Sequence, residues 1–412
     1  MCYPVLLNRR SAAWHERWRR CPPGSRITGY ISLGLLTRRF PRSTVDRVLR
    51  QSGRAGRRQR DLSAPVMVYC VITLALYMQV SCREVWRCLL EGLSWLRATP
   101  QRPAAASRSG ISRARIRLGA EPLRQLHDEL VKPIAGPASR GSWYGGRRLV
   151  SLDGSVLDLA DEPGNLQAFG RPGASRGTSA YPQLRSVSLL ENGTHVLFGS
   201  RMGPCAESEI ALVRQLLPEL KKDMLCLAGR NFFSYPLWKQ ARGTGADLLW
   251  RVKKNLRPPV ERLLAGGSYP SRVYSCEPDR RSQTNGIEVR VIEYRLEGIE
   301  NAEPLYRLLT TLLDPAAAPA PELAALYHQR WEIETAFDEL KTHLRGSKIV
   351  LRGKTPELVR HEFCGLAHFA IRDLMQQAAE KGQQDPDQLS CLHAVRLVHR
   401  KLAIAVAIPP SG

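Results

Sequence analysis

Lysine and acidic residues are scarce at the start of this chain. The first 60 residues hold 15 Arg, no Lys and two acids, Glu16 and Asp46, which gives a charge of 15 − 2 = +13 out of a net +23 for all 412 residues. A segment this basic binds polyanions or stays solvated. We therefore expect nucleic acid as a partner.

Other absences exclude common kinds of site and location. The ten Cys form no CxxC pair and no Cys/His cluster, so the sequence does not indicate a zinc site. The apolar run at 64–78 is too short to span a membrane and reads as a buried core helix. The first residues lack the apolar core and cleavage site of a signal peptide. We expect a cytoplasmic, nucleoid-associated bacterial protein with no membrane partner.

The most informative stretch is 327–344. On a helix, Tyr327, Arg330, Glu334 and Lys341 fall within about one sixth of the circumference. A separate apolar stripe lies beside them, formed by Leu326, Ile333, Phe337, Leu340 and Leu344. A carboxylate that can hold a divalent cation, next to cations and donors that can hold phosphates, is what phosphodiester chemistry needs. The alternative is a charged surface helix.

A second candidate carboxylate follows an apolar run. Residues 149–155 read Leu-Val-Ser-Leu-Asp-Gly-Ser, which predicts a buried strand that carries Asp153 outward. A lone Asp at a strand end is more often a turn residue. The Leu-Asp-Gly-Ser context, residues 152–155, is what favours a functional role for Asp153.

The spacing Tyr-x2-Arg-x3-Glu-x6-Lys resembles the signature of the IS4-type insertion-sequence transposases, and the Leu-Asp-Gly-Ser context resembles the family's first catalytic strand. The resemblance covers roughly residues 30–380. It implies an Asp-Asp-Glu triad on a ribonuclease H-like fold, with Asp153 and Glu334 as the first and third members. It also implies that these two residues hold Mg²⁺ or Mn²⁺.

The second triad position departs from the family pattern. Residues 224–228 read as the next core strand, and the family's Leu-Ala-Asp-Arg-x-Phe-Phe-Ser corresponds here to Leu-Ala-Gly229-Arg230-Asn-Phe-Phe-Ser. Glycine has no side-chain oxygen for a metal. Asp223 lies roughly 20 Å away along the strand and cannot replace it. A damaged copy of a mobile element, or a sequencing error, would account for Gly229.

The missing carboxylate matters because of the chemistry. The family transfers DNA strands by in-line attack on a phosphodiester, with two metal ions stabilising the attacking and leaving oxygens. Asp153 and Glu334 could still anchor one ion, whereas the second site would be weak. Tyr327, Arg330 and Lys341 are expected to bind DNA, together with Arg230 and with the N-terminal Arg57, Arg58 and Arg60.

The pattern along the chain predicts an α/β protein. We expect a basic extension at 1–27, an all-α N-terminal DNA-binding domain at 28–135, a catalytic domain at 145–380 and a tail at 381–412. The N-terminal helices are expected at 44–51 with Ser43 as N-cap, at 63–80 and 82–93, and as a pair within 112–130.

The catalytic domain should be a ribonuclease H-like mixed sheet flanked by helices. Strands are expected at 147–153, 184–191, 195–202 and 247–253, with Glu191-Asn-Gly-Thr194 as a hairpin turn. Helices are expected at 207–220, from Ser234 onward and at 356–380. The β-like pattern at about 255–305 corresponds to the family's β-rich insertion.

Three functions remain open. The first is a cut-and-paste DNA transposase that binds terminal inverted repeats and target DNA as a homo-oligomer in a synaptic complex, impaired by the loss of the second Asp. The second is a catalytically inactive DNA-binding relic or a repressor of active copies. The third is a metal-dependent nuclease, which the basic helical N-terminus and the Tyr, Arg and Lys of the motif disfavour.

Overall fold

The structure is a computed structural model. It describes residues 33–56, 62–76, 81–83, 85–86, 89, 106–174, 177–296, 303–338, 351–363, 366–383, 389–391 and 394–395, and every structural statement below concerns these residues. None of the helices in this part of the chain is long and apolar enough to cross a membrane.

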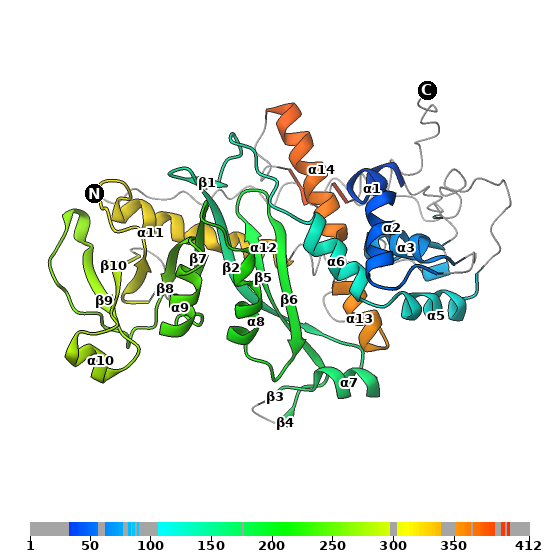
Figure 1. Ribbon diagram of the computed structural model, residues 1–412, viewed down its shortest axis with the longest axis horizontal. Helices are drawn as coiled ribbons and strands as arrows, with labels where there is room; N and C mark the ends of the chain where they lie inside the picture. Colours follow the sequence, from blue (N-terminus) through cyan, green and yellow to red (C-terminus); the bar gives the residue numbers. More distant parts are fainter. Residues whose placement is uncertain are drawn as a thin grey trace, which may run out of the picture.

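A mixed β-sheet forms the centre of the molecule (Figure 1). Its first five strands, in spatial order, are β6 (Val196–Pro204), β5 (Gln183–Glu191), β2 (Arg147–Asp158), β7 (Met224–Ala228) and β8 (Asp247–Arg251). Strands β2, β7 and β8 are parallel, and β5 and β6 are antiparallel to their neighbours. This is the ribonuclease H-like core that the sequence predicted, with all of β7 buried at its centre.

The predicted β-rich insertion extends this same sheet. Strands β11 (Tyr306–Thr310), β10 (Ile287–Tyr294) and β9 (Tyr269–Val273) follow β8 in that order, all antiparallel. Helix α10 (Glu277–Ser282) lies at their outer end (Figure 1). Three short strands lie outside the insertion. Strand β1 (Trp143–Tyr144) pairs with β2, and β3 (Gly173–Ala174) pairs with β4 (Gly177–Thr178).

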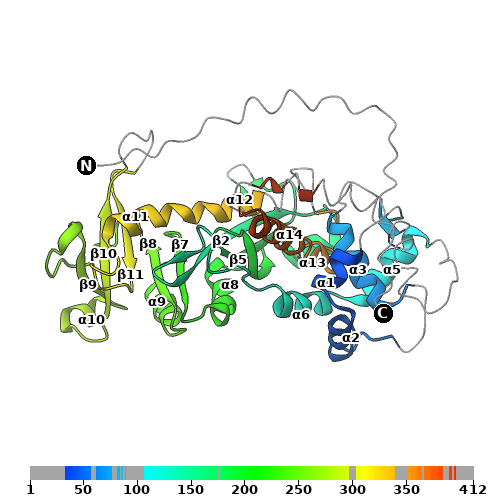
Figure 2. The same cartoon turned by 90° about the horizontal axis from the view of Figure 1, so that it is seen from above.

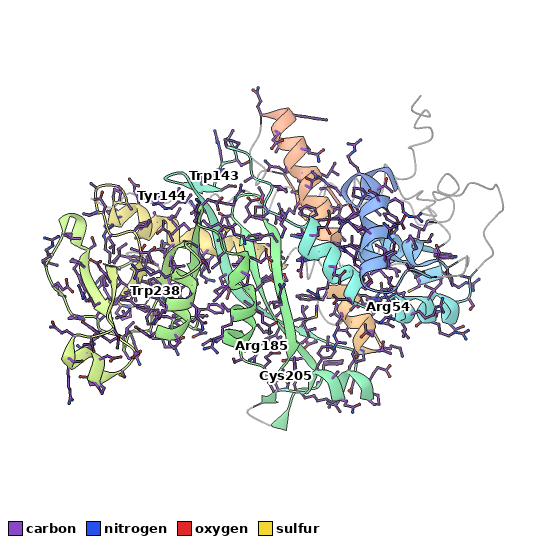
Figure 3. The ribbon with its side chains drawn as sticks, in the orientation of Figure 1. Arg54, Trp143, Tyr144, Arg185, Cys205 and Trp238 are labelled. Atoms are coloured by element: carbon purple, nitrogen blue, oxygen red, sulfur yellow. The ribbon has the colours of Figure 1, made fainter. Side chains whose placement is uncertain are left out.

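Helices cover both faces of the sheet. Helices α8 (Glu209–Leu216) and α9 (Tyr235–Arg242) lie on one face, and α11 (Ala320–His328) and α12 (Glu332–Asp338) lie on the other (Figure 2). Alternation along the strands explains this: Leu225 and Leu227 pack beneath α11, while Cys226 and Ala228 join the core on the side of α8 and α9. Tyr144 of β1 is labelled in Figure 3; its hydroxyl donates to Glu322 Oε2 of α11 at 3.1 Å and ties β1 to that helix.

The stretch at 327–338 is not the continuous helix that its periodicity predicted. A 3₁₀ turn, η4 (Gln329–Trp331), separates α11 from α12, and 339–350, including Lys341, lie outside the described residues. The three described members of the predicted apolar stripe, Leu326, Ile333 and Phe337, are nevertheless buried, and Leu340 and Leu344 lie outside the described residues.

The N-terminal helices form a separate layer at one end of the molecule (Figure 1). Their bounds are α1 (Leu33–Arg39), α2 (Arg42–Gln51), α3 (Ala64–Leu76), α5 (Arg108–Leu118) and α6 (Glu121–Leu130). Helix α3 is apolar all round and lies in the middle of this layer, with ten of its residues buried. Two of the predicted boundaries were wrong: α2 begins after Pro41 and not at a Ser43 cap, and α5 starts before residue 112.

Helices from the far end of the chain pack against this layer. In the region of the predicted helix at 356–380 the structure describes α13 (Pro356–Phe363) and α14 (Leu366–Gly382), and residues 364–365 between them lie outside the described residues. Arg39 of α1 pairs with Asp373 of α14, and Arg115 of α5 lies 3.8 Å from Glu362 of α13. Helix α14 also contacts β6, so it lies between the N-terminal helices and the sheet.

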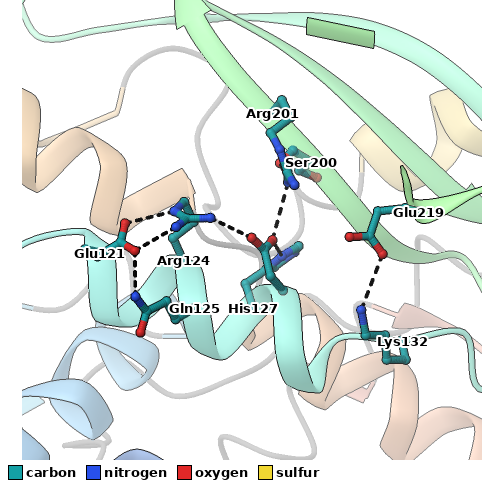
Figure 4. Close-up of polar contacts among 9 residues, drawn as sticks. Glu121, Arg124, Gln125, His127, Lys132, Ser200, Arg201 and Glu219 are labelled. Carbon is teal, nitrogen blue, oxygen red and sulfur yellow. Dashed lines mark hydrogen bonds and ion pairs between the residues drawn. The ribbon is translucent and has the colours of Figure 1, made fainter. Parts of the chain in front are cut away.

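Helix α6 and the segment that follows it make further polar contacts, with β6 and with the 3₁₀ turn η2 (Leu217–Glu219) (Figure 4). Asp128 accepts from Arg124 at 2.8 Å and from Arg201 of β6 at 3.4 Å. Lys132, just beyond the helix, reaches Glu219 at 3.4 Å. The N-terminal helices therefore contact the sheet through charged side chains as well as through α14.

Candidate active site

Asp153 lies within β2, at the point where the parallel strands β2 and β7 part. The strand continues to Asp158, so Asp153 does not end it as the sequence suggested. Leu152 pairs with Ala228, which makes Asp153 and Gly229 the next positions on the two neighbouring strands. The Asp153 side chain is partly exposed, and its Oδ1 accepts from the Gly154 N–H at 2.8 Å.

Gly229 follows β7 and has room for a side chain. A Cβ built at this position would meet, as its nearest neighbour, the guanidinium carbon of Arg330 at 4.0 Å, which is ordinary van der Waals contact. Its backbone does not have the positive φ that would require glycine. Neither space nor backbone conformation therefore explains the glycine.

Arg330 of η4 lies between the two candidate carboxylates. Its Nη1 donates to Asp153 Oδ2 at 2.5 Å, and its Nη2 is 3.4 Å from Glu334 Oε1. Burial lowers the pKa of Arg330, but the opposing charge of its neighbours, Asp153 among them, outweighs it, so the pKa lies above the usual value. The guanidinium thus occupies the space that Asp153, Gly229 and Glu334 enclose.

Glu334 and Tyr327 differ in exposure, although both lie beside Arg330. The Glu334 side chain is 61% exposed. The Tyr327 ring is buried among the apolar residues under α11, and its hydroxyl donates to the Ala228 carbonyl at 3.4 Å. Burial, above all, raises the pKa of Tyr327. Its hydroxyl is directed at the backbone next to Gly229.

Arg230 points to the insertion. It donates to Glu303 Oε1 at 2.5 Å, and Arg251 at the end of β8 is 2.6 Å from Glu303 Oε2. The Arg251 guanidinium also stacks 4.5 Å over the Tyr306 ring. The hydrogen bond from Arg251, first of all, lowers the pKa of Glu303. One carboxylate therefore holds two arginines at the carboxyl ends of β7 and β8.

The structure brings together Asp153, Gly229, Arg330 and Glu334, with Tyr327 beneath them. The remaining expected DNA contacts, Lys341, Arg57, Arg58 and Arg60, lie outside the described residues. Sequence reasoning missed Glu303, which opposes Arg230, and Asn192 and Glu332, whose contacts are described below. The sequence Glu191-Asn-Gly-Thr194 correctly indicated a hairpin turn at Asn192, but nothing in it indicated that this turn contacts the site.

Comparison with known proteins identifies the family. Residues 30–128 match the family model described as insertion element 4 transposase N-terminal, and residues 144–369 match the transposase DDE domain. The chain belongs to the IS4-type DDE transposases. It is therefore a transposase of an insertion sequence, in a class of enzymes that cleave and transfer DNA.

Two relatives from Escherichia coli (strain K12) are similar to this transposase. Transposase InsG for insertion sequence element IS4 is 29% identical over 367 residues, which cover 87% of this chain and 80% of the relative. Putative transposase InsZ is 26% identical over 215 residues, 48% of this chain and 71% of the relative. A cryo-EM structure of the piggyBac transposase synaptic complex with hairpin DNA gives a TM-score of 0.47 at 12% identity, covering 91% of this chain and 80% of that one.

The DDE domain implies divalent metal ions, but the side chains at this edge of the sheet do not fit a pair of them. Two carboxylates face the site, Gly229 adds none, and a guanidinium pairs with both. Among the described residues, no group of three His, Cys, Asp or Glu side chains could hold a metal ion. Two metal ions would need more oxygen ligands than Asp153 and Glu334 supply.

Proposed function

We propose that this transposase binds the terminal inverted repeats of its insertion sequence, and that its strand cleavage is impaired because Gly229 stands where a second carboxylate belongs. The observation that carries the proposal is the clustering of Asp153, Gly229, Arg330 and Glu334 at one edge of a ribonuclease H-like sheet. Asp153 and Glu334 would be metal ligands in a complete triad.

Arg330 has a specific role in this proposal. A guanidinium held by two carboxylates can exchange them for phosphate oxygens, because it offers the same paired donors to either. Its place beside Asp153 would bring a bound phosphate to the reacting edge. Lys341, Arg230 and the N-terminal Arg57, Arg58 and Arg60 would hold phosphates further along the DNA.

DNA binding is tested by salt dependence. The probe is a duplex copied from the DNA that flanks the coding region, compared with a scrambled duplex of equal length. If six or more phosphates are contacted, the observed binding constant should fall by roughly 10³-fold or more between about 50 and 200 mM salt. Replacing Arg57, Arg58 and Arg60 by Gln should reduce this slope, because fewer phosphates are then contacted. Binding that ignores salt, or that is unchanged by these replacements, would contradict the proposal.

The second candidate is a catalytically inactive DNA-binding protein that represses active copies. Gly229 favours it, because DNA binding needs no metal ligand. Repression through mixed oligomers would require that this chain assembles with an intact relative. Inhibition of cleavage by a Gly229→Asp variant on addition of the unmodified chain would favour this role over a relic without function.

A further inference from the structure

We propose that the turn between β5 and β6, residues 191–195, positions Arg330 against Asp153, and that Asn192 is the residue that joins the two. The inference rests on the proposed phosphate-binding role of Arg330. The turn was predicted as an ordinary hairpin connection, and such turns lie at the surface. Here it is buried: Glu191 and Asn192 are 0% exposed and Thr194 is 2% exposed.

The Asn192 side chain links both parts of the site. Its Oδ1 accepts from Ser151 Oγ at 2.8 Å, and Ser151 lies two residues before Asp153 on β2. Its Nδ2 donates to the Gln329 carbonyl at 3.0 Å, and Gln329 lies one residue before Arg330. A single amide therefore connects the strand of the first carboxylate to the turn of the arginine.

A second contact fixes the start of the helix that carries Glu334. The Gly193 N–H donates to Oε2 of Glu332, the first residue of α12, at 2.6 Å. Gly193 has φ +77°, and a Cβ there would lie 2.3 Å from the Arg140 carbonyl oxygen. Only glycine fits this conformation and this space, so the contact depends on Gly193.

The turn itself is held rigidly. The buried Glu191 carboxylate accepts from the backbone N–H groups of Ile134 at 2.7 Å and Ala135 at 3.0 Å, and from Thr194 Oγ1 at 2.6 Å. It also pairs with Arg148. Four partners on one buried carboxylate leave the turn little freedom.

Such support is needed because the helix breaks at this point. Arg330 lies in the 3₁₀ turn between α11 and α12, where hydrogen-bond geometry is poorer than in an α-helix. Helical continuity therefore does not define its direction. Asn192 contacts Gln329 before Arg330, and Gly193 contacts Glu332 after it. The hairpin turn therefore fixes the backbone on both sides of Arg330.

The first test is a double-mutant cycle on DNA binding. Asn192→Asp keeps the size and the acceptor but removes the donor to Gln329. We expect it and Arg330→Ala each to weaken binding of the flanking-DNA duplex by about 10-fold, and the double variant to bind no more weakly than Arg330→Ala alone. Additive losses would overturn the inference, because Asn192 would then not act through Arg330.

Asn165 provides a matched control. It is also 0% exposed, and its Nδ2 likewise donates to backbone carbonyls, in this case two, of Ala160 at 3.0 Å and of Gly353 at 2.9 Å. Asn165→Asp should lower stability but leave binding of the duplex unchanged within about 2-fold, and any loss should add to that of Arg330→Ala.

Hydrogen exchange separates this inference from the proposed function. Asn192→Asp should raise amide exchange in 329–338, whereas Asn165→Asp should leave that segment unchanged. If the amides of 329–338 exchange as slowly in Asn192→Asp as in the unmodified chain, the inference fails, whether or not DNA binding is weakened. If Arg330→Ala binds DNA normally, the phosphate role fails, and exchange still decides the positioning role. Should Asn192→Asp not fold, Ser151→Ala, which removes the donor on β2, is expected to give the same exchange result.

Discussion

Two arginines, Arg330 of η4 and Arg290 of β10, are bound by different kinds of partner. At the active-site edge, Arg330 pairs with the partly exposed carboxylates of Asp153 and Glu334. In the insertion, Arg290 of β10 is 0% exposed and donates to Ser268 Oγ at 2.9 Å and to backbone carbonyls, the shortest bond being 2.6 Å to Ala318.

The two sets of partners indicate that Arg330, but not Arg290, can exchange its present partners for phosphate oxygens. Backbone carbonyls are fixed by the fold, so Arg290 locks the insertion to the segment that leads into α11. Carboxylates near solvent can be replaced by phosphate at small cost, because one charge-assisted bond substitutes for another. The comparison predicts that substitutions beside Asp153, such as those of Gly229 and Arg330, alter DNA cleavage or DNA binding. Substitutions of fully buried residues such as Arg290 should instead lower the free energy of unfolding.

The largest effect is expected at Gly229. Gly229→Asp should raise cleavage of a duplex that carries an element end, with Mg²⁺ or Mn²⁺ present, by several orders of magnitude, because it restores the missing ligand of a two-metal site. The open space beside Gly229 accepts the side chain. Gly229→Asn, of nearly equal size but uncharged, is the control and should help far less.

Cleavage by the unmodified chain that equals that of Gly229→Asp would show that the triad assignment is wrong or that another carboxylate serves. If the Asp variant folds and binds DNA but does not cleave, a further lesion lies elsewhere in the chain.

Arg290 should give the largest loss of stability. Arg290→Met leaves buried oxygens without a donor, and we expect the free energy of unfolding to fall by roughly 3–5 kcal/mol in urea denaturation. Arg272, on the neighbouring strand β9, is the control: its side chain is 50% exposed, and Arg272→Met should cost less than about 0.5 kcal/mol. If both variants lost the same free energy of unfolding, the claim that Arg290 stabilises the fold through its buried hydrogen bonds would fail.

His361 extends the same contrast to pH. Burial, followed by the nearby Arg115 charge, lowers the pKa of His361 from 6.5 to about 4. Between these values the unfolded chain binds more protons than the folded one, so this contribution to stability is complete above pH 6.5 and is lost as pH falls toward 4. The loss should reach roughly 3 kcal/mol.

The measurement compares the unmodified chain with His361→Phe by urea denaturation at several pH values. The difference between their unfolding free energies should change between pH 6.5 and 4 and stay level above pH 7. A difference that does not vary with pH would mean that His361 is not held neutral by the packing of α13 on α5.

The smallest effect is expected at Arg330 itself. Arg330→Ala should weaken binding of an element end by about 10-fold while changing stability by less than about 1 kcal/mol, and Arg330→Lys should restore binding only in part because lysine cannot make the paired contact.

Arg307 is the matched control for Arg330. Its side chain is 11% exposed against 12% for Arg330, and its carboxylate partner Glu293 also lies at 2.5 Å. Arg307→Ala should leave DNA binding unchanged. If both variants lose binding alike, the effect comes from general charge and not from the position of Arg330.

Much of the site could be predicted from the sequence because its signals are local. The spacing of Tyr327, Arg330 and Glu334, and the apolar runs before Asp153 and Gly229, depend on periods that neighbouring residues define. The same periods predicted the core strands. They did not predict the 3₁₀ turn at 329–331, because the helical spacing of the apolar residues continues through it from Leu326 to Ile333 and Phe337.

The sequence by itself determined the family, the strands of the core, the two candidate carboxylates and the glycine between them. Tertiary structure alone decided that Arg330 pairs with both carboxylates, that Tyr327 is buried, and that Asn192 and Gly193 contact Gln329 and Glu332 on either side of Arg330. It also decided that α13 and α14 pack on the N-terminal helices. These contacts join residues far apart along the chain, and a polar side chain such as Asn192 carries no mark in the sequence of the partners that folding will bring to it.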